Sequence, residues 1–208
     1  MKVAFMGNPK FALPSLESLL QSKHEVKAVV SNPAKPMGRK RALKHTDVGS
    51  YSIQNNIELI ELDSFNNNAI YKKLFSLNVD IFVVVAYRIL PEDYISIPKF
   101  GSINLHASLL PSYRGAAPIQ WALMNGEKTT GVSVFQIEKK VDTGKIITQA
   151  KIDIDKNDNY EILSNKLSKV GAGALVEALN NLEEGEVDYN KQDNSLVTKA
   201  PKISKEML

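Results

Sequence analysis

One apolar stretch decides the fold class of this sequence: Val79-Asp80-Ile81-Phe82-Val83-Val84-Val85-Ala86. From Ile81 onward this stretch is a continuous apolar run, which is typical of a strand that is buried on both faces of a parallel sheet. Upstream of it, shorter apolar runs lie at residues 2–6, 26–30 and 57–60. Stretches of helical spacing lie between them and after them, at residues 13–20 and 70–77. This alternation predicts an α/β fold, with a Rossmann-like open sheet that is mostly parallel and carries helices on both faces.

Downstream of the apolar stretch, the pattern predicts two more helices and further strands. In order, these are a strand at residues 103–106, a helix at 117–124, strands at 132–137 and 145–152, and a long helix at 160–182. Residues 183–208 are polar and mixed in charge. We therefore expect one domain over residues 1–182, followed by a tail or linker.

The composition of the 208 residues is that of an ordinary globular protein, with 43% hydrophobic and 24% charged residues. The absence of cysteine excludes disulfides, thiolate metal sites and a cysteine nucleophile, and it suits a reducing compartment. The first apolar run is too short for a signal peptide, and no stretch approaches the roughly 18 apolar residues of a membrane span. We expect a cytoplasmic protein that does not contact membranes. The net charge of +3 does not by itself argue for nucleic acid.

Open α/β sheets bind ligands beyond the carboxyl ends of their strands, and three polar residues suit such a place. Asn104 and His106 are two residues apart, so a strand would present both side chains on one face. The amide can donate to a developing oxyanion, and the imidazole can exchange a proton near neutral pH. Asp142 lies in a glycine-containing turn between two expected strands and is a candidate for orienting the imidazole. Together these groups suit an acyl-type reaction.

Spacing alone does not decide the role of these residues. A lone histidine is more often structural, and an aspartate in a turn is usually a turn former. Ser108 lies near His106, but no Gly-x-Ser-x-Gly elbow surrounds it, which weakens a serine hydrolase. The remaining histidines, His24 and His45, lie in unrelated segments without metal-ligand spacing. The first strand runs into Gly7-Asn8-Pro9, so neither a dinucleotide fingerprint nor a P-loop is present.

Longer motifs resemble the family of 10-formyltetrahydrofolate-dependent formyltransferases, along essentially the whole chain and in order. The central motif is Asn104-Leu105-His106-Ala107-Ser108-Leu109-Leu110-Pro111, and it runs on through Arg114-Gly115-Ala116-Ala117-Pro118-Ile119-Gln120. The first part resembles the whole superfamily, and the second is closer to the branch that formylates methionyl-tRNA. Further stretches resemble the family's N-terminal strand and turn, basic loop and aspartate loop, at residues 5–11, 35–41 and 141–147. Asn8 stands where the family more often has threonine or serine.

The resemblance implies an enzyme that transfers a formyl group from 10-formyltetrahydrofolate to an amine, with no metal and no covalent intermediate. It implies that Asn104 holds the formyl oxygen and its oxyanion, and that His106 assists proton transfer. Asp142 would orient His106 and help to relay the proton of the amine. The folate would bind two loops, made of Val85, Ala86, Tyr87, Arg88, Ile89, Leu90, Ser108, Leu109, Leu110 and Pro111.

The same resemblance implies methionyl-tRNA as the acceptor and translation initiation as the process. The basic loop would contact tRNA phosphates through Arg39, Lys40 and Arg41, although a basic run is more often only a solvated surface. Relatives continue into a small β-barrel domain that also touches tRNA, and the end of this chain resembles the linker to it. We expect a monomer.

The sequence leaves two alternatives open. Sugar-nucleotide N-formyltransferases use the same donor and share the Asn-x-His motif and the folate loop, but the basic loop and residues 114–120 argue against them. Glycinamide ribonucleotide formyltransferase lacks the continuation over residues 114–120. A non-catalytic folate- or RNA-binding module would not need Asn104, His106 and Asp142 together.

Overall fold

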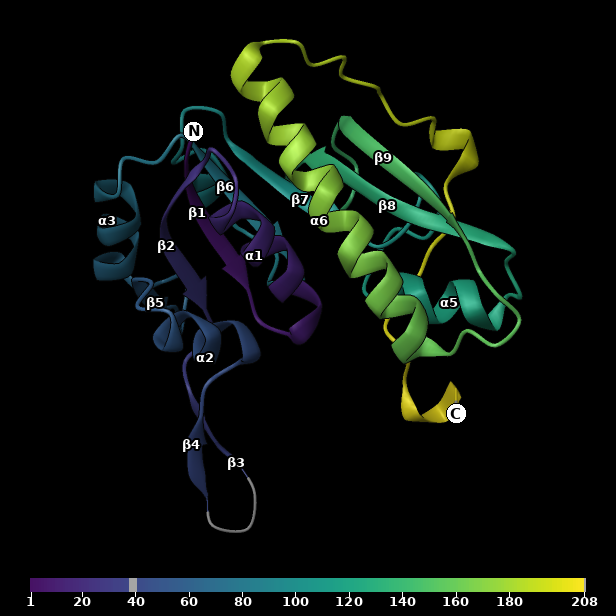
Figure 1. The fold of residues 1–208 in the computed structure, drawn as a ribbon, viewed down its shortest axis with the longest axis horizontal. Coiled ribbons are helices and arrows are strands. Elements are labelled where there is room, and N and C mark those ends of the chain that lie inside the picture. Colours follow the sequence, from purple (N-terminus) through teal and green to yellow (C-terminus); the bar gives the residue numbers. More distant parts are fainter. Residues whose placement is uncertain (38–40, 208) are drawn as a thin grey trace. The chain divides into compact units, whose positions relative to one another are not determined.

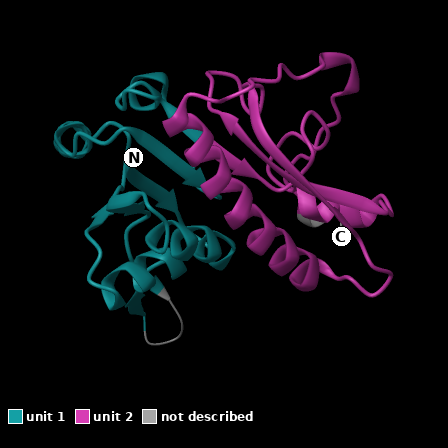
Figure 2. Cartoon of the chain, turned by 45° about the horizontal axis from the view of Figure 1, so that its top comes forward, with its two compact units in different colours: residues 1–103 teal, residues 104–208 magenta. Residues whose placement is uncertain are grey.

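The computed structural model describes residues 1–37 and 41–207 (Figure 1). The chain divides into two compact units, unit 1 (Met1–Ile103) and unit 2 (Asn104–Leu208), which Figure 2 shows in teal and magenta. The boundary falls within strand β7 (Ser102–His106). Asn104, His106 and Asp142 therefore all belong to unit 2.

Unit 1 is built on a parallel sheet with the strand order β5-β2-β1-β6. The strands are β1 (Lys2–Gly7), β2 (Glu25–Ser31), β5 (Leu59–Glu61) and β6 (Ile81–Val85). The helices that alternate with them are α1 (Leu13–Leu20), α2 (Asp47–Gln54) and α3 (Asn68–Ser76), and α4 (Glu92–Ile95) follows β6. Parallel neighbours need such crossovers because a tight hairpin turn joins only antiparallel strands. The predicted alternation of strands and helices is confirmed.

The core of unit 1 comes from the apolar runs. Every residue of β6 is buried, and Val3, Ala4, Phe5 and Met6 of β1 are fully buried beside it. Residues at the start of each helix determine where α1 and α3 begin. Pro14 lies in the first turn of α1, where its missing N–H costs no hydrogen bond. The side chain of Asn67 accepts from two backbone N–H groups at the start of α3.

The basic loop forms a hairpin that projects from unit 1 in Figure 1. Its arms are β3 (Lys35–Met37) and β4 (Ala42–Lys44), which pair antiparallel with Lys35 opposite Lys44. Arg41 is exposed and has a left-handed φ of 48°. The two other residues predicted to bind tRNA, Arg39 and Lys40, lie outside the described residues. The sequence predicted a basic loop here but not its two short strands.

Unit 2 carries β7, β8 (Thr129–Gln136) and β9 (Ile146–Asp153) in that order, with β8 and β9 antiparallel. It also contains α5 (Pro118–Met124) and α6 (Tyr160–Glu184), and α6 packs against β8 and β9 (Figure 1). At Gly171 the backbone of α6 comes so close to β7 that a Cβ would lie 2.7 Å from Leu105 Cδ2. The predicted long helix is confirmed and ends at Gly185, in the left-handed conformation that glycine favours.

The chain after α6 packs back against the rest of unit 2. Lys199 pairs with Arg114 as an isolated bridge, and Ala200 is fully buried. The indole N–H of Trp121 donates to the carbonyl oxygen of Pro201 at 2.8 Å. Much of the predicted tail is thus hydrogen-bonded to the rest of unit 2. The β-barrel domain beyond it stays a prediction. No helix in the described parts of the chain is long and apolar enough to cross a membrane.

Candidate active site

Strand β7 presents two polar side chains on one face. Asn104 and His106 alternate with Ile103 and Leu105, whose side chains are buried. This alternation follows from the two-residue period of a strand, as the sequence predicted. His106 is itself only 7% exposed, so the imidazole is held by the protein and not by bulk water.

The imidazole of His106 has a partner at each ring nitrogen. Its Nε2 lies 2.9 Å from the carbonyl oxygen of Tyr113, and because a carbonyl only accepts, Nε2 must carry a proton. Its Nδ1 lies 3.8 Å from Oδ2 of Asp142, which is within ion-pair range but too long for a hydrogen bond. A proton that enters or leaves the ring while the Tyr113 bond lasts must therefore do so at Nδ1, on the side of Asp142.

Asp142 is fixed both by its backbone and by its carboxylate. It lies in the turn between β8 and β9 with a φ of 54°, a left-handed conformation that aspartate tolerates better than most residues. Its Oδ2 accepts from the backbone N–H of Gly115 at 2.8 Å. Gly115 has a φ of 129°, and a Cβ there would lie 2.5 Å from the carbonyl oxygen of Ala200. Only glycine can therefore bring this N–H to the carboxylate.

Gln192 joins the Asp142 turn to the loop that contains Gly115. Its side-chain amide donates to the backbone oxygens of Asp142 and Gly144, at 3.0 and 2.8 Å. Its side-chain oxygen accepts from Nε and Nη2 of Arg114, at 3.0 and 2.6 Å. Gln192 was not among the predicted site residues, because a glutamine inside a polar segment gives no spacing signal.

Residues 108–111 form a loop directly after β7, and β8 anchors them. The hydroxyl of Ser133 donates to the carbonyl oxygen of Ser108 at 2.7 Å and accepts from the backbone N–H of Leu110 at 2.9 Å. Ser108 is fully buried, and its own hydroxyl donates to the carbonyl oxygen of Ser112 at 2.6 Å. These bonds give Ser108 a structural role, and they lend no support to a serine nucleophile.

The other loop assigned to folate, residues 85–90, follows β6 in unit 1. The guanidinium of Arg88 donates to two backbone oxygens of unit 1, at 2.6 and 3.0 Å, so its charge is engaged inside this unit. Burial raises the pKa of the neighbouring Tyr87 phenol. Ile89, by contrast, is 72% exposed. A ligand at this strand end would therefore meet backbone groups and an apolar side chain, and not the charge of Arg88.

A basic cavity of about 560 Å³ lies beside the Asp142 turn in unit 2. Its lining combines cationic, polar and acidic side chains, namely Arg114, Lys140, Lys145, Lys191, Thr143, Gln192, Asn194 and Glu138. Four cationic side chains against one acidic side chain make this wall electropositive. The sequence did not predict the cavity because its lysines come from separate stretches. In the part of the chain that the structure describes, no group of metal-ligating side chains gathers.

Comparison with known proteins places the chain in a family. The formyl transferase family matches residues 1–179, and the chain belongs to it. The methionyl-tRNA formyltransferase of Caldanaerobacter subterraneus subsp. tengcongensis is 42% identical over 209 residues, covering 100% of this chain and 68% of the relative. That of Thermodesulfovibrio yellowstonii is 43% identical over 205 residues, covering 98% of this chain and 66% of the relative. The chain thus spans about two thirds of the length of these relatives.

Solved structures agree on the fold. Glycinamide ribonucleotide transformylase 1 from Symbiobacterium toebii has a TM-score of 0.76 at 19% identity, covering 93% of this chain and 94% of that one. The N-formyltransferase from Helicobacter canadensis, in complex with folinic acid and dTDP-3-aminofucose, has a TM-score of 0.74 at 23% identity. It covers 100% of this chain and 72% of that one. The Rossmann-like α/β formyltransferase fold predicted from the sequence is confirmed.

Proposed function

We propose that this chain transfers a formyl group from 10-formyltetrahydrofolate to the amino group of methionyl-tRNA. One observation carries the proposal: in a member of the formyl transferase family, His106 Nδ1 lies 3.8 Å from Asp142 Oδ2, with Asn104 on the same face of β7. The acceptor is proposed from relatives of that name at 42% and 43% identity. The solved N-formyltransferase in complex with dTDP-3-aminofucose is only 23% identical to this chain in sequence.

The side chains supply what an amine needs to attack a formyl carbon. The folate, as co-substrate, would bring that carbon. The amide of Asn104 donates to the formyl oxygen and to the oxyanion that develops as the new C–N bond forms. His106, at Nδ1, and Asp142 receive the proton that the amine loses. The same proton ends on the folate nitrogen as its bond to the formyl carbon breaks, so no covalent bond to the protein is needed.

The two loops have properties that suit a pterin ring. Such a ring is flat and rich in donors and acceptors, which backbone groups can match. Residues 85–90 follow the carboxyl end of a parallel strand, the usual ligand position in open α/β sheets. The exposed Ile89 suits one face of a flat ring. The anchoring of Leu110 by Ser133 keeps the second loop in one conformation.

An anionic acceptor suits the charges of both units. The cavity beside Asp142 is electropositive, and the hairpin of unit 1 carries Lys35, Arg41 and Lys44. Lysine and arginine that neutralise phosphates supply the part of nucleic-acid affinity that does not depend on sequence. These charges support an acceptor that carries phosphates, as tRNA does.

The proposal is tested by an acceptor comparison. The protein is incubated with 10-formyltetrahydrofolate and, separately, with methionyl-tRNA, a nucleotide-linked amino sugar or glycinamide ribonucleotide, and the release of tetrahydrofolate is followed. We expect release with methionyl-tRNA, and its loss when Asn104→Ala and His106→Ala are combined. Turnover on the amino sugar alone would identify the amino sugar, and not methionyl-tRNA, as the acceptor. Folate binding without turnover on any amine would indicate a binding module. Turnover that survives the double substitution would refute the assigned roles.

A further inference from the structure

Gln192 is bonded at both ends of its side-chain amide, and both ends lead to Asp142. We propose that Gln192 is a positioning residue, which holds the carboxylate of Asp142 against the imidazole of His106. The proposal rests on the proposed formyl transfer, in which these two groups move the proton of the amine. It assigns a role to a residue of the C-terminal segment that no motif in the sequence indicated.

One end of the amide fixes the backbone of Asp142. Its N–H groups donate to the carbonyl oxygens of Asp142 and Gly144, at 3.0 and 2.8 Å. These donors stabilise a turn in which Asp142 adopts a left-handed φ of 54°. Gly144 also lies close against Gln136, because a Cβ at Gly144 would lie 1.7 Å from the carbonyl oxygen of Gln136, whose backbone N–H donates to Lys145 at 2.9 Å. The turn is therefore confined between the end of β8 and Gln192.

The other end of the amide fixes the carboxylate of Asp142. The oxygen of Gln192 accepts from two nitrogens of Arg114, at 3.0 and 2.6 Å. Arg114 directly precedes Gly115, whose N–H donates to Asp142 Oδ2 at 2.8 Å. The bonds thus close a ring that runs from the backbone of Asp142 through Gln192, Arg114 and Gly115 to its carboxylate. Displacing one member loosens the position of the others.

The segment that supplies Gln192 is itself bonded on both sides. Before it, the backbone of Asn190 exchanges two hydrogen bonds with Ile146, at 2.9 and 3.0 Å. After it, the backbone N–H of Arg114 donates to Thr198 at 3.0 Å, and that of Ala200 donates to Arg114 at 2.7 Å. Gln192 is therefore delivered to the Asp142 turn by an ordered strap, residues 190–200, across the face of unit 2.

Two substitutions test the two ends of the Gln192 side-chain amide separately. Gln192→Met keeps the size of the side chain and removes every bond, whereas Gln192→Glu keeps the acceptor for Arg114 and removes both donors to the turn. Ser195→Ala is the matched control on the same strap, because Ser195 is not among the residues that line the cavity and its hydroxyl donates to Asp193, at 2.7 Å, and not to the Asp142 turn.

We expect both Gln192 variants to lower kcat, by about 100-fold for a displacement of the order of 1 Å, with KM for folate within about twofold of wild type. In the free protein, the imidazole NMR signals of His106 should move, while those of His24 and His45 stay. Ser195→Ala should leave kcat and these signals unchanged. If the Gln192→Met variant does not fold, the Gln192→Glu variant is sufficient for the test.

The proposal is overturned if the Gln192 variants lose thermal stability but keep kcat and the His106 signals, since Gln192 would then be merely structural. It is also overturned if Ser195→Ala gives the same loss of kcat, because the effect would then belong to the strap as a whole. Absence of formyl transfer by the wild-type protein would refute the proposed function instead. The His106 signals, which need no substrate, would still decide whether Gln192 positions Asp142.

Discussion

At the scale of the residue, backbone groups hold both His106 and Asp142 in place. His106 uses Nε2 for the carbonyl of Tyr113 and turns Nδ1 toward Asp142. Asp142 is bonded through Oδ2 to the N–H of Gly115. Asn104 shares the strand face with His106. Substitutions that keep the size of a side chain but change its donors are therefore the most informative ones.

Asn104→Asp replaces a donor by a carboxylate of nearly the same shape. We expect kcat to fall by about 10²–10³-fold, because the oxyanion would lose a hydrogen bond and meet a negative charge. The melting temperature should stay close to that of wild type, since Asn104 is not in the buried core. Steady-state kinetics and thermal unfolding of the same preparation measure both. A variant that keeps half of the wild-type kcat would remove Asn104 from the mechanism.

Gly115→Ala tests the close approach of the Gly115 loop to Ala200. A Cβ would lie 2.5 Å from the carbonyl oxygen of Ala200, at a φ of 129° that alanine avoids. We expect a loss of about 1–3 kcal/mol in the free energy of unfolding, together with loss of activity. Gly173→Ala is the control, because a Cβ at this helical position meets no described atom within 4 Å. It should stabilise by about 0.4–1 kcal/mol in urea unfolding.

At the scale of the element, regular patterns could be predicted from the sequence and contacts between distant segments could not. The apolar run of β6 and the two-residue period of Asn104 and His106 are local properties. The placement of Asp142 came from resemblance, because spacing does not say which turn meets β7. Gln192 reaches the Asp142 turn only through the return of the chain after α6, and no local pattern encodes that return.

Helix α6 begins with an ion pair that gives its N-terminal end a pH dependence. Lys166 lies 2.8 Å from Asp158, and this hydrogen bond lowers the pKa of Asp158 below its ordinary value of 3.8. A lowered pKa means that the stabilisation is fully present above pH 3.8 and is lost as the pH falls through the folded-state pKa. The experiment therefore compares neutral pH, where the ion pair is intact, with acidic pH, where it is lost.

We expect Asp158→Asn to lower the free energy of unfolding at neutral pH and to converge with wild type in acid. Urea unfolding from neutral pH down to about pH 2 measures the two curves, because the loss is complete only below the lowered pKa of Asp158. The exposed Asp153→Asn variant is the control. Parallel curves for wild type and Asp158→Asn over the whole range would contradict the role of the ion pair.

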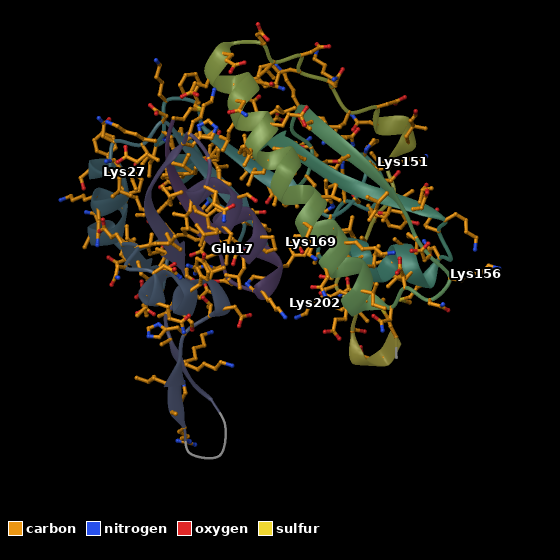
Figure 3. All side chains as sticks on the ribbon, in the orientation of Figure 1. Glu17, Lys27, Lys151, Lys156, Lys169 and Lys202 are labelled. Atoms are coloured by element: carbon orange, nitrogen blue, oxygen red, sulfur yellow. The ribbon has the colours of Figure 1, made fainter. Side chains whose placement is uncertain are left out.

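At the scale of the whole molecule, Asn104, His106 and Asp142 all belong to unit 2. The charge of the chain is small, +3, but it is unevenly distributed. Lys140 and Lys191 line the cavity beside the Asp142 turn, and Lys151 lies on β9 outside that lining, where Figure 3 labels it. This contrast allows local charge to be tested against total charge.

Removing two charges from the cavity should weaken tRNA binding more than removing charge elsewhere. We expect Lys140→Gln with Lys191→Gln to raise KM for methionyl-tRNA and to reduce the slope of log KM against log salt by about 1–2. KM for folate should not change. Lys151→Gln, combined with Lys156→Gln, is the matched control for net charge. Equal effects of the two pairs would show that the cavity has no special part in binding tRNA.

The bond between Trp121 and Pro201 has an optical consequence. Trp121 is the one tryptophan of the sequence, and its indole N–H donates to a backbone oxygen just after the strap. Its fluorescence is therefore a label-free reporter of the end of the chain. Detachment of this stretch would let water reach the ring and shift its emission toward the red, so stopped-flow spectroscopy can time the detachment without any dye.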